Sequence, residues 1–252
     1  MKRLIVQTLN RLGIRFITRN SPLWGDISRT FEPEFLPIWQ ACSPFTITSA
    51  ECVYALFRAV SYVIANRIPG DIVECGVFRG GSVMACAHSL HHFGDHKRRL
   101  FLYDTFEGMT QPTERDVDFM GRTAEDHLKT WGVSRMNEMT ACSLEQVRQN
   151  VSTCPYPPEK FVFVKGPVEQ TIPQTVPDRI SILRLDTDWF ESTRHEMVHL
   201  FPRLAPGGVV VIDDYGFWTG AREAVDGYIR ENKISLLLTC IDRTGASIGV
   251  KP

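Results

Sequence analysis

Hydrophobic residues of this chain gather in short continuous runs that are separated by longer amphipathic segments. The first run follows Asp71, and the next ones cover Leu100–Asp104, Phe161–Lys165, Ile180–Asp186 and Val209–Asp213. Strands with continuous apolar runs are covered on both faces, and parallel strands require connecting segments such as helices. The pattern therefore predicts an α/β fold with a mostly parallel sheet and helices on both of its faces.

Helical periodicity marks most of the connecting segments. Thr48 and Glu51 are spaced as a capping box, and apolar residues recur on one face from there to Asn66. Further helices are expected over residues 83–93, 143–151, 194–204 and 221–231. The last two runs, Ile234–Ile241 and Ala246–Val250, predict an antiparallel hairpin at the end of the sheet.

Two segments lack this organisation. Prolines interrupt the aromatic positions of residues 1–45, which predicts an irregular arm, and residues 46–252 are expected to form one domain. The arm either packs on its own domain, covers the mouth of a site or joins copies of the chain in a homo-oligomer. Residues 109–140 are polar and too long for an ordinary connection, so we expect a lid or substrate loop there.

Composition narrows the class of partner. The chain has 252 residues, of which 43% are hydrophobic, and its formal net charge is -1. This size suits one core, and the balanced charge gives no field that would attract nucleic acid or an anionic membrane. No apolar run reaches the roughly 20 residues of a membrane helix. The seven cysteines are scattered without a Cys-x-x-Cys pair, which favours reduced thiols, a cytoplasmic location and small-molecule partners.

Pairs of acidic residues end two neighbouring runs. Asp186 and Asp188 follow one run, and Asp213 and Asp214 follow the next. Side chains at i and i+2 of an extended chain share a face, and neighbouring strands lie about 4.8 Å apart, so the two pairs can meet. Mutual repulsion favours a bound cation, and carboxylate ligands favour Mg²⁺, Ca²⁺ or Mn²⁺. The alternative is that these acids cap helices or lie in solvent at the sheet edge.

A glycine-rich turn follows the first run. Gly76, Gly80 and Gly81 permit a tight turn and close approach of a ligand, and Ser82 is placed to cap the next helix. A nucleotide-like group would fit at such a helix start. Asp104 ends the second run, where an acid can accept hydrogen bonds from ribose hydroxyls. The alternative is a turn cap in front of Thr105 and Phe106.

The segment His195-Glu196-Met197-Val198-His199 also matches the His-Glu-x-x-His signature of zinc peptidases. We reject a zinc site there for two reasons. Thr193 and Glu196 are spaced as a capping box, and a helical wheel places His195 and His199 opposite the apolar face, toward solvent. The histidines at 88, 91, 92 and 96 are likewise expected on a solvated helix face near its C-terminal end.

Five blocks together resemble the macrocin O-methyltransferase family. They are ECGVFRGGS (74–82), LYDTFEGM (102–109), FVKGPVEQTIP (163–173), LRLDTDWFEST (183–193) and APGGVVVIDDYG (205–216). The resemblance implies a Rossmann-like class I methyltransferase fold with a seven-stranded sheet. It implies an enzyme that uses S-adenosyl-L-methionine and Mg²⁺, or another divalent cation such as Mn²⁺, to methylate a sugar hydroxyl of a natural product or glycan. The acceptor would then be a glycosylated small molecule.

The resemblance also implies roles for individual residues. Asp186, Asp213 and Asp214 would bind the metal, and Asp186 or Asp188 would accept the proton of the hydroxyl. The residues implied in cofactor binding are Glu74, Gly76, Val77, Gly80, Gly81, Ser82, Asp104, Thr105, Phe106, Gly166 and Asp186. Three alternatives stay open: a methyltransferase of a catechol-like or other diol, a zinc hydrolase that uses His195 and His199, and a cofactor-binding protein without catalysis.

Overall fold

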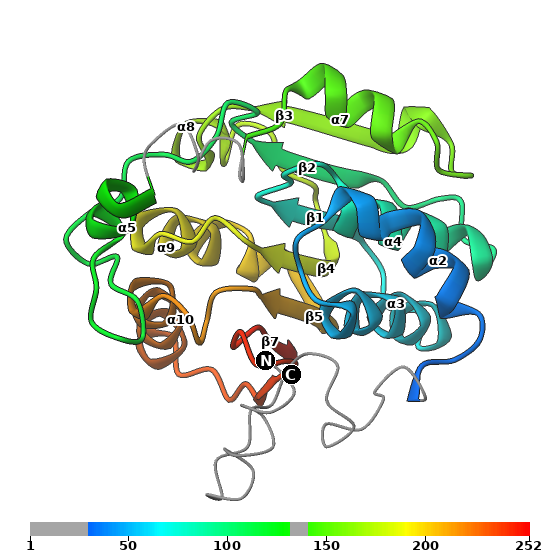
Figure 1. The fold of residues 1–252 in the computed structure, drawn as a ribbon. Helices are drawn as coiled ribbons and strands as arrows, with labels where there is room; N and C mark the ends of the chain where they lie inside the picture. The colour runs from blue at the N-terminus through cyan, green and yellow to red at the C-terminus, as the bar shows by residue number, and fades with distance from the viewer. Residues whose placement is uncertain (1–29, 132–140) are drawn as a thin grey trace, which may run out of the picture. The chain divides into compact units, whose positions relative to one another are not determined.

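In a computed structural model of the protein, residues 30–131 and 141–252 are described (Figure 1). Residues 37–252 contain a seven-stranded sheet with the strand order β3-β2-β1-β4-β5-β7-β6. The strands are β1 (Asp71–Cys75), β2 (Leu100–Asp104), β3 (Phe161–Lys165), β4 (Ile180–Leu185), β5 (Leu204–Ile212), β6 (Leu238–Cys240) and β7 (Ser247–Val250). The seven strands and their α/β arrangement confirm the predicted fold class.

Parallel pairing of the first five strands brings their carboxyl ends to one edge of the sheet. β1 pairs in parallel with both β2 and β4, β3 joins β2, and β5 joins β4. β7 is antiparallel to β5, and β6 is antiparallel to β7, so the predicted C-terminal hairpin is confirmed. Ligands of such sheets bind outside the carboxyl ends of the strands, where the strand order reverses on either side of β1.

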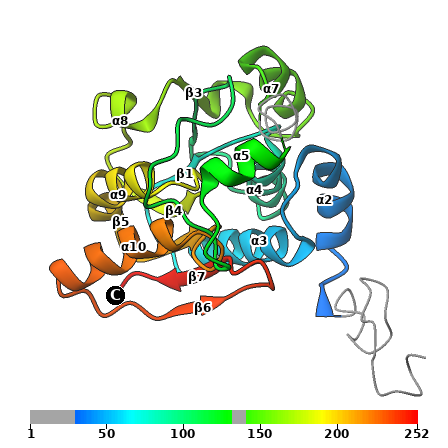
Figure 2. The same cartoon turned by 60° about the vertical axis from the view of Figure 1, so that its left-hand side comes forward.

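Helices cover both faces of the sheet. Figure 2 shows α3, α4 and α7 on one side of it and α8, α9 and α10 on the other. The helices are α2 (Phe35–Cys42), α3 (Ala50–Ala65), α4 (Gly81–His92), α5 (Ala124–Trp131), α7 (Leu144–Val151), α8 (Val168–Thr171), α9 (Phe190–His199) and α10 (Thr219–Glu231). Short 3-10 turns cover Ser43–Phe45, Pro158–Lys160 and Phe201–Arg203.

The core is built from the central strands and the inner faces of these helices. Val73, Leu183 and Val210 of three adjacent strands are fully buried, and Met197 of α9 and Val225 of α10 pack in the same cluster. Their continuous apolar runs are covered on both faces, as expected for parallel strands. β2 and β3 have the predicted bounds, while β4 and β5 each end one residue before the predicted aspartate.

The predicted caps of α3 and α4 are wrong. The cap of α3 is Ser49, whose hydroxyl accepts a bond from the amide of Cys52, and not Thr48. The cap of α4 is Gly80 in a left-handed conformation, so Ser82 does not cap that helix and lies buried within its first turn. In both cases the sequence offers two nearby residues that suit the position, and the backbone of the preceding turn decides between them.

The two segments that were expected to be irregular contain some regular structure. α2 begins at Phe35, within the expected arm, although prolines surround it. The expected loop contains α5 and two isolated bridges, from Val117 to Thr123 and from Asp118 to Trp218. Residues 1–29 of the arm and 132–140 of the loop lie outside the described residues. The described helices include none that is long and apolar enough to cross a membrane. All seven cysteines are free.

Candidate active site

Backbone hydrogen bonds beyond the strand ends position the functional loops. The amide of Asp186 donates to Cys75 O at 2.9 Å, and the amide of Asp213 donates to Leu185 O at 2.9 Å. The parallel ladder thus continues for one residue past β4 and β5. Because each loop is fixed by the neighbouring strand, the carboxylates that follow these strands converge at one edge of the sheet.

The convergent carboxylates are Asp186, Asp213 and Asp214. One oxygen from each lies within 4.8 Å of the others, and residues 30–131 and 141–252 hold no other group of three or more possible metal ligands. Oδ2 of Asp214 is buried and has no hydrogen-bond partner among the described residues. Burial raises the pKa of both Asp186 and Asp214, and neighbouring carboxylates raise it further. A cluster of three carboxylates in which one buried oxygen has no hydrogen-bond partner among the described residues fits a divalent cation.

Asp188 reaches this cluster by a different route from the one predicted. Its backbone is left-handed, with φ of 65°, so the segment after β4 is not the extended chain on which the i and i+2 argument rested. Indole Nε1 of Trp218 donates to Asp188 Oδ1 at 3.1 Å and fixes the side chain. Burial, followed by repulsion from Asp186, raises the pKa of Asp188 to about 7. Its role as a proton acceptor stays a prediction.

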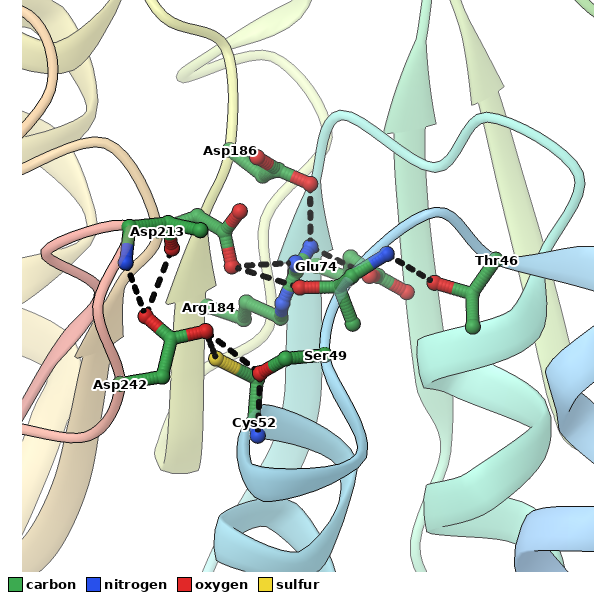
Figure 3. Close-up of polar contacts among 10 residues, drawn as sticks. Thr46, Ser49, Cys52, Glu74, Arg184, Asp186, Asp213 and Asp242 are labelled. Carbon is green, nitrogen blue, oxygen red and sulfur yellow. Dashed lines mark hydrogen bonds and ion pairs between the residues drawn. The ribbon is translucent and has the colours of Figure 1, made fainter. Parts of the chain in front are cut away.

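Arg184 is the cation in the middle of these carboxylates, and sequence reasoning missed it. Its guanidinium pairs with Glu74 at 2.9 Å, Asp186 at 2.6 Å and Asp213 at 2.7 Å (Figure 3). Only 4% of its side chain is exposed. The signal was present in the sequence, because an arginine within an apolar strand needs buried carboxylate partners. The residue joins β1, β4 and β5 at the level of the site.

Glycines of the turn after β1 are required by close contacts within the chain. Gly76 has φ of 81°, and a Cβ there would lie 1.9 Å from the carbonyl oxygen of Asp186. A Cβ on Gly81 would lie 2.6 Å from Cβ of Thr46. The first glycine therefore lets the β1 and β4 loops touch, and the second lets the chain before α3 cross the start of α4. The predicted cofactor contacts of this turn stay predictions.

Glu74 lies below the turn and is almost completely buried. Its Oε1 accepts from Arg184, while Oε2 has no hydrogen-bond partner among the described residues. Burial raises the pKa of Glu74 to about 7, although the adjacent Arg184 opposes the shift. A buried carboxylate oxygen without a hydrogen-bond donor destabilises the folded protein. A bound ligand that donates an N–H group to this oxygen would remove that cost.

Asp104 caps two turns at once. Its Oδ2 accepts from the amides of Val77 at 2.6 Å and Phe78 at 3.2 Å, and its Oδ1 accepts from Phe106 at 2.7 Å. Phe78 and Phe106 have positive φ values of 51° and 54°. The carboxylate thus stabilises two strained turns beside the site. Burial outweighs these bonds and raises its pKa. Its predicted contact with a ribose stays a prediction.

The other candidate positions after β2 and β3 are held by local bonds. Thr105 Oγ1 donates to Gly108 O, and the amide of Glu107 donates to Thr105 Oγ1 at 3.1 Å. Gly166, with φ of 134°, donates its amide to Asp104 O at 2.9 Å. These residues all lie at the carboxyl ends of β2 and β3, where ligands of such sheets bind.

The start of α3 and the β6–β7 loop form one wall of the site. Thr48 Oγ1 donates to Asp213 Oδ1 at 3.4 Å. The Ser49 hydroxyl and the Cys52 thiol both donate to Asp242 Oδ2 (Figure 3). Sequence analysis missed this wall, because nothing in the local pattern shows that residues almost two hundred positions apart in the chain are neighbours.

An aromatic cluster lies next to Asp188, which accepts from Trp218. Trp189 and Trp218 pack edge to face with ring centroids 5.1 Å apart, and Met109 and Phe217 pack against them. Indole Nε1 of Trp189 donates to Thr110 O at 3.0 Å, which ties the loop after β2 to the start of α9. Aromatic residues that follow the acidic positions thus fix the loops that carry these acids.

The interpretation of the His-Glu-x-x-His segment needs correction. α9 begins at Phe190, so Glu196 lies in mid-helix, fully buried, and accepts from Thr187 Oγ1 at 3.0 Å instead of forming a capping box. His195 and His199 are half-buried, and His195 Nε2 lies 2.9 Å from Ile172 O. Within the described part of the chain neither histidine belongs to a group of three metal ligands. The capping box that was offered as a reason against a zinc site is therefore wrong, and the rejection of a zinc site stays a prediction.

Replacing Glu196 by Gln is expected to remove a pH-dependent loss of stability. Burial raises the pKa of Glu196 to about 8, so the folded state holds a proton that the unfolded state releases at lower pH. The wild-type protein should therefore lose stability as pH rises from about 5 to 8, by at most about 1.4 kcal/mol for each pH unit. Urea unfolding at several pH values measures the difference in the free energy of unfolding between the wild-type protein and Glu196→Gln. Glu191→Gln, at an exposed residue, is the control. A difference that does not grow with pH would contradict this assignment.

Comparison with known proteins assigns the family. The sequence model described as macrocin O-methyltransferase (TylF) matches residues 40–248. This chain belongs to that family. A relative in Streptomyces olivaceus, an 8-demethyl-8-(2,3-dimethoxy-α-L-rhamnosyl)-tetracenomycin-C 4'-O-methyltransferase, is 37% identical over 74% of this chain and 68% of its own length. The demethyldecarbamoylnovobiocin O-methyltransferase of Streptomyces niveus is 32% identical over 75% of this chain and 69% of its own length.

Solved structures of O-methyltransferases agree with the family assignment. The O-methyltransferase NovP superposes with a TM-score of 0.72 at 29% identity, over 82% of this chain and 82% of its own. The calicheamicin methyltransferase CalS11 shares the fold, with a TM-score of 0.57 at 18% identity, over 99% of this chain and 92% of its own. The predicted family and class I methyltransferase fold are confirmed, and the chain is an S-adenosylmethionine-dependent O-methyltransferase.

Proposed function

We propose that this protein transfers a methyl group from S-adenosylmethionine to a hydroxyl of a sugar on a glycosylated small molecule, with the help of a divalent cation. The observation that carries the proposal is the convergence of Asp186, Asp213 and Asp214 beside the turn that follows β1. The name of the relative in Streptomyces olivaceus includes a dimethoxy-rhamnosyl group, which supports a glycosylated acceptor. This name favours a sugar over the catechol-like acceptor.

The residues that hold the cofactor would come from the loops after β1 and β2. Glu74 Oε2 is a buried acceptor without a described donor, and the ammonium group of the methionine part would supply one. Asp104 is positioned at the end of β2, where its remaining lone pairs would face the ribose hydroxyls. Asp104 also accepts hydrogen bonds from the amides of Val77 and Phe106, and these bonds hold the loops after β1 and β2 in place.

The residues that hold the cation would be the three convergent aspartates. Their oxygens are hard ligands, and Mg²⁺ or Mn²⁺ bound to three carboxylates would keep other coordination positions for solvent or acceptor oxygens. When bound, the cofactor would supply an electrophilic methyl group and the cation would supply Lewis acidity. Asp186 or Asp188 would accept the proton of the acceptor hydroxyl. Arg184 would keep Asp186 and Asp213 in the positions that these roles require.

Isothermal titration with S-adenosylmethionine, with and without Mg²⁺, tests the proposal. We expect cofactor binding in both conditions. We also expect methyl transfer to a rhamnosyl glycoside, and this reaction should stop when EDTA is added and resume when Mg²⁺ is restored. Glu74→Gln should weaken cofactor binding about tenfold or more, because hydrogen bonds to charged groups are worth about 1.5–3 kcal/mol. The exposed Glu145→Gln serves as control. Absence of cofactor binding both with and without Mg²⁺ would refute the proposal. Cofactor binding without methyl transfer to any glycoside would indicate a binding protein without catalysis.

We also propose that copies of the chain associate through residues 1–45 and that the protein is cytoplasmic. The many aromatic residues of the arm and the free thiols support these two proposals. Light scattering of the full chain and of a chain that begins at residue 46 would test the first. An unchanged oligomeric state in the shorter chain would contradict it.

A further inference from the structure

A short turn beyond the carboxyl edge of the sheet presents two large apolar side chains to solvent. Phe119 is 63% exposed and Met120 is 67% exposed. The turn belongs to the segment between β2 and α5, which Figure 1 shows beyond the carboxyl ends of β4 and β5. Exposed neighbouring apolar residues cost solubility, and where a structure holds them in place they often mark a contact surface.

Buried polar residues anchor both sides of this turn. Asp116 is fully buried, and its Oδ1 accepts from the amide of Phe190 at the start of α9 at 2.7 Å. The carbonyl oxygen of Val117 accepts from the amide of Thr219 at the start of α10 at 2.8 Å. The segment is therefore bonded to the two helices that follow the acidic loops, and its backbone is not free to collapse onto the protein.

Asp118 then closes the turn itself. Its Oδ1 accepts from the amides of Met120 at 2.8 Å and Arg122 at 2.9 Å, and its Oδ2 lies 2.8 Å from His127 Nε2. Only 1% of Asp118 is exposed. Ordering these residues costs conformational entropy, and the result is a rigid turn whose two central apolar side chains have no protein core to enter.

The turn is continuous with the candidate active site. The amide of Phe119 donates to Phe217 O at 2.9 Å, and the two rings lie 5.6 Å apart. Phe217 and Trp218 both donate their amides to Asp214 O at 3.0 Å. Backbone hydrogen bonds and one ring contact therefore join the loop of Asp214, through Phe217, to the turn that carries Phe119 and Met120.

We propose that Phe119, Met120 and Phe217 form a binding surface for the apolar aglycone of the acceptor, while the sugar lies at the aspartate cluster. This inference rests on the proposed function. A glycosylated acceptor that places its sugar at the edge of the sheet extends its aglycone outward, and this surface is joined through Phe217 to the loop of Asp214. Methionine adapts to irregular apolar shapes, and aromatic rings stack on flat ones.

A second copy of the chain is the competing occupant. Stable interfaces use about 800 Å² and 20–30 residues of each partner. Two exposed side chains on one turn are far fewer, and the charged side chain of Arg122, which is 57% exposed, lies two residues after them. The surface suits a small apolar ligand better than a subunit.

A pair of matched probes tests the inference. Binding of 2-naphthyl α-L-rhamnoside and methyl α-L-rhamnoside is measured by titration in the presence of S-adenosylhomocysteine and Mg²⁺. The wild-type protein should bind the naphthyl compound about tenfold more tightly, as expected when part of an aromatic group is buried. The double variant Phe119→Ser/Met120→Ser should lose this preference and keep the affinity for the methyl compound. Leu237→Ser, at a residue that is 82% exposed on another part of the domain, should keep the preference.

Three other results of these binding measurements would contradict the proposed aglycone surface. No preference of the wild-type protein for the naphthyl compound, including no detectable binding of either compound, would overturn it. An unchanged preference in the double variant would also overturn it, as would a change in its oligomeric state by light scattering, which would assign the surface to a second copy. Failure of the proposed function is separate, since it would appear as absent binding of S-adenosylmethionine to the wild-type protein.

Discussion

Asp186→Asn should lower the affinity for Mg²⁺ and the rate of methyl transfer together, each by at least about a hundredfold. Loss of a residue that only supports a metal ligand costs roughly 10–100-fold, so loss of a ligand should cost no less. Asn keeps one oxygen that can still accept from Arg184, which in any case retains Glu74 and Asp213 as partners. The fold should therefore survive, and the loss would be local to the site.

Mn²⁺ titration followed by electron paramagnetic resonance measures metal affinity independently of activity. Asp178→Asn, at an exposed aspartate just before β4, is the matched control and should leave both quantities unchanged. Asp213→Asn and Asp214→Asn should resemble Asp186→Asn in metal affinity. If Asp186→Asn lost turnover but kept its affinity for Mn²⁺, Asp186 would act on the proton alone, and the assignment of three metal ligands would be wrong.

The sequence predicts the sheet because its strands are defined by short-range composition. β2 and β3 follow from continuous apolar runs that end at a polar residue, and such runs have few other structures open to them. Helix starts were less predictable. Thr48 and Ser49 suit the cap of α3 equally well, and the Ser49 hydroxyl that caps the helix also donates to Asp242 of a distant loop.

The candidate site divides in the same way. The three aspartates were predictable, because parallel strands must bring their carboxyl ends to one edge. Asp188 was predicted to lie near them for the wrong reason, since its left-handed backbone and its bond from Trp218 place it. The wall formed by Thr48 and Asp242 depends on how α3 and the last hairpin pack on the sheet, which no local pattern contains.

Arg184 shows what sequence reasoning could still have gained. An arginine in the apolar run Ile182–Leu185 cannot be buried without carboxylates, and Glu74 occupies the equivalent level of the neighbouring strand. The register Glu74↔Arg184↔Val211 places the pair one residue before the strands end. One cation of the acid cluster is therefore built into the chain, and the proposed function adds a second one from solution.

Arg184→Met is the substitution we expect to destabilise the fold most within the site. It leaves Glu74, Asp186 and Asp213 without their common partner, and breaking a buried ion pair by removing one member costs about 3–5 kcal/mol. Arg194→Met is the control, because the side chain of Arg194 is 40% exposed and its pair with Glu231 is a surface contact. Such pairs contribute about 0–1 kcal/mol. Urea unfolding of the metal-free proteins at pH 7 measures both.

Charge balance, and not the loss of side-chain volume, should explain the effect of Arg184→Met. Adding Glu74→Gln to this variant removes one unpaired carboxylate, so the double variant should recover part of the lost stability. Without the guanidinium, the pKa values of the nearby carboxyl groups should rise, and the variant should lose more stability as pH increases. Mg²⁺ should stabilise Arg184→Met more than the wild-type protein, because carboxylates that have lost the guanidinium should bind the cation more tightly, and stabilisation of the folded state rises with the logarithm of that affinity. Equal stabilisation of the two proteins by Mg²⁺, with no recovery in the double variant, would show that Arg184 acts by packing alone.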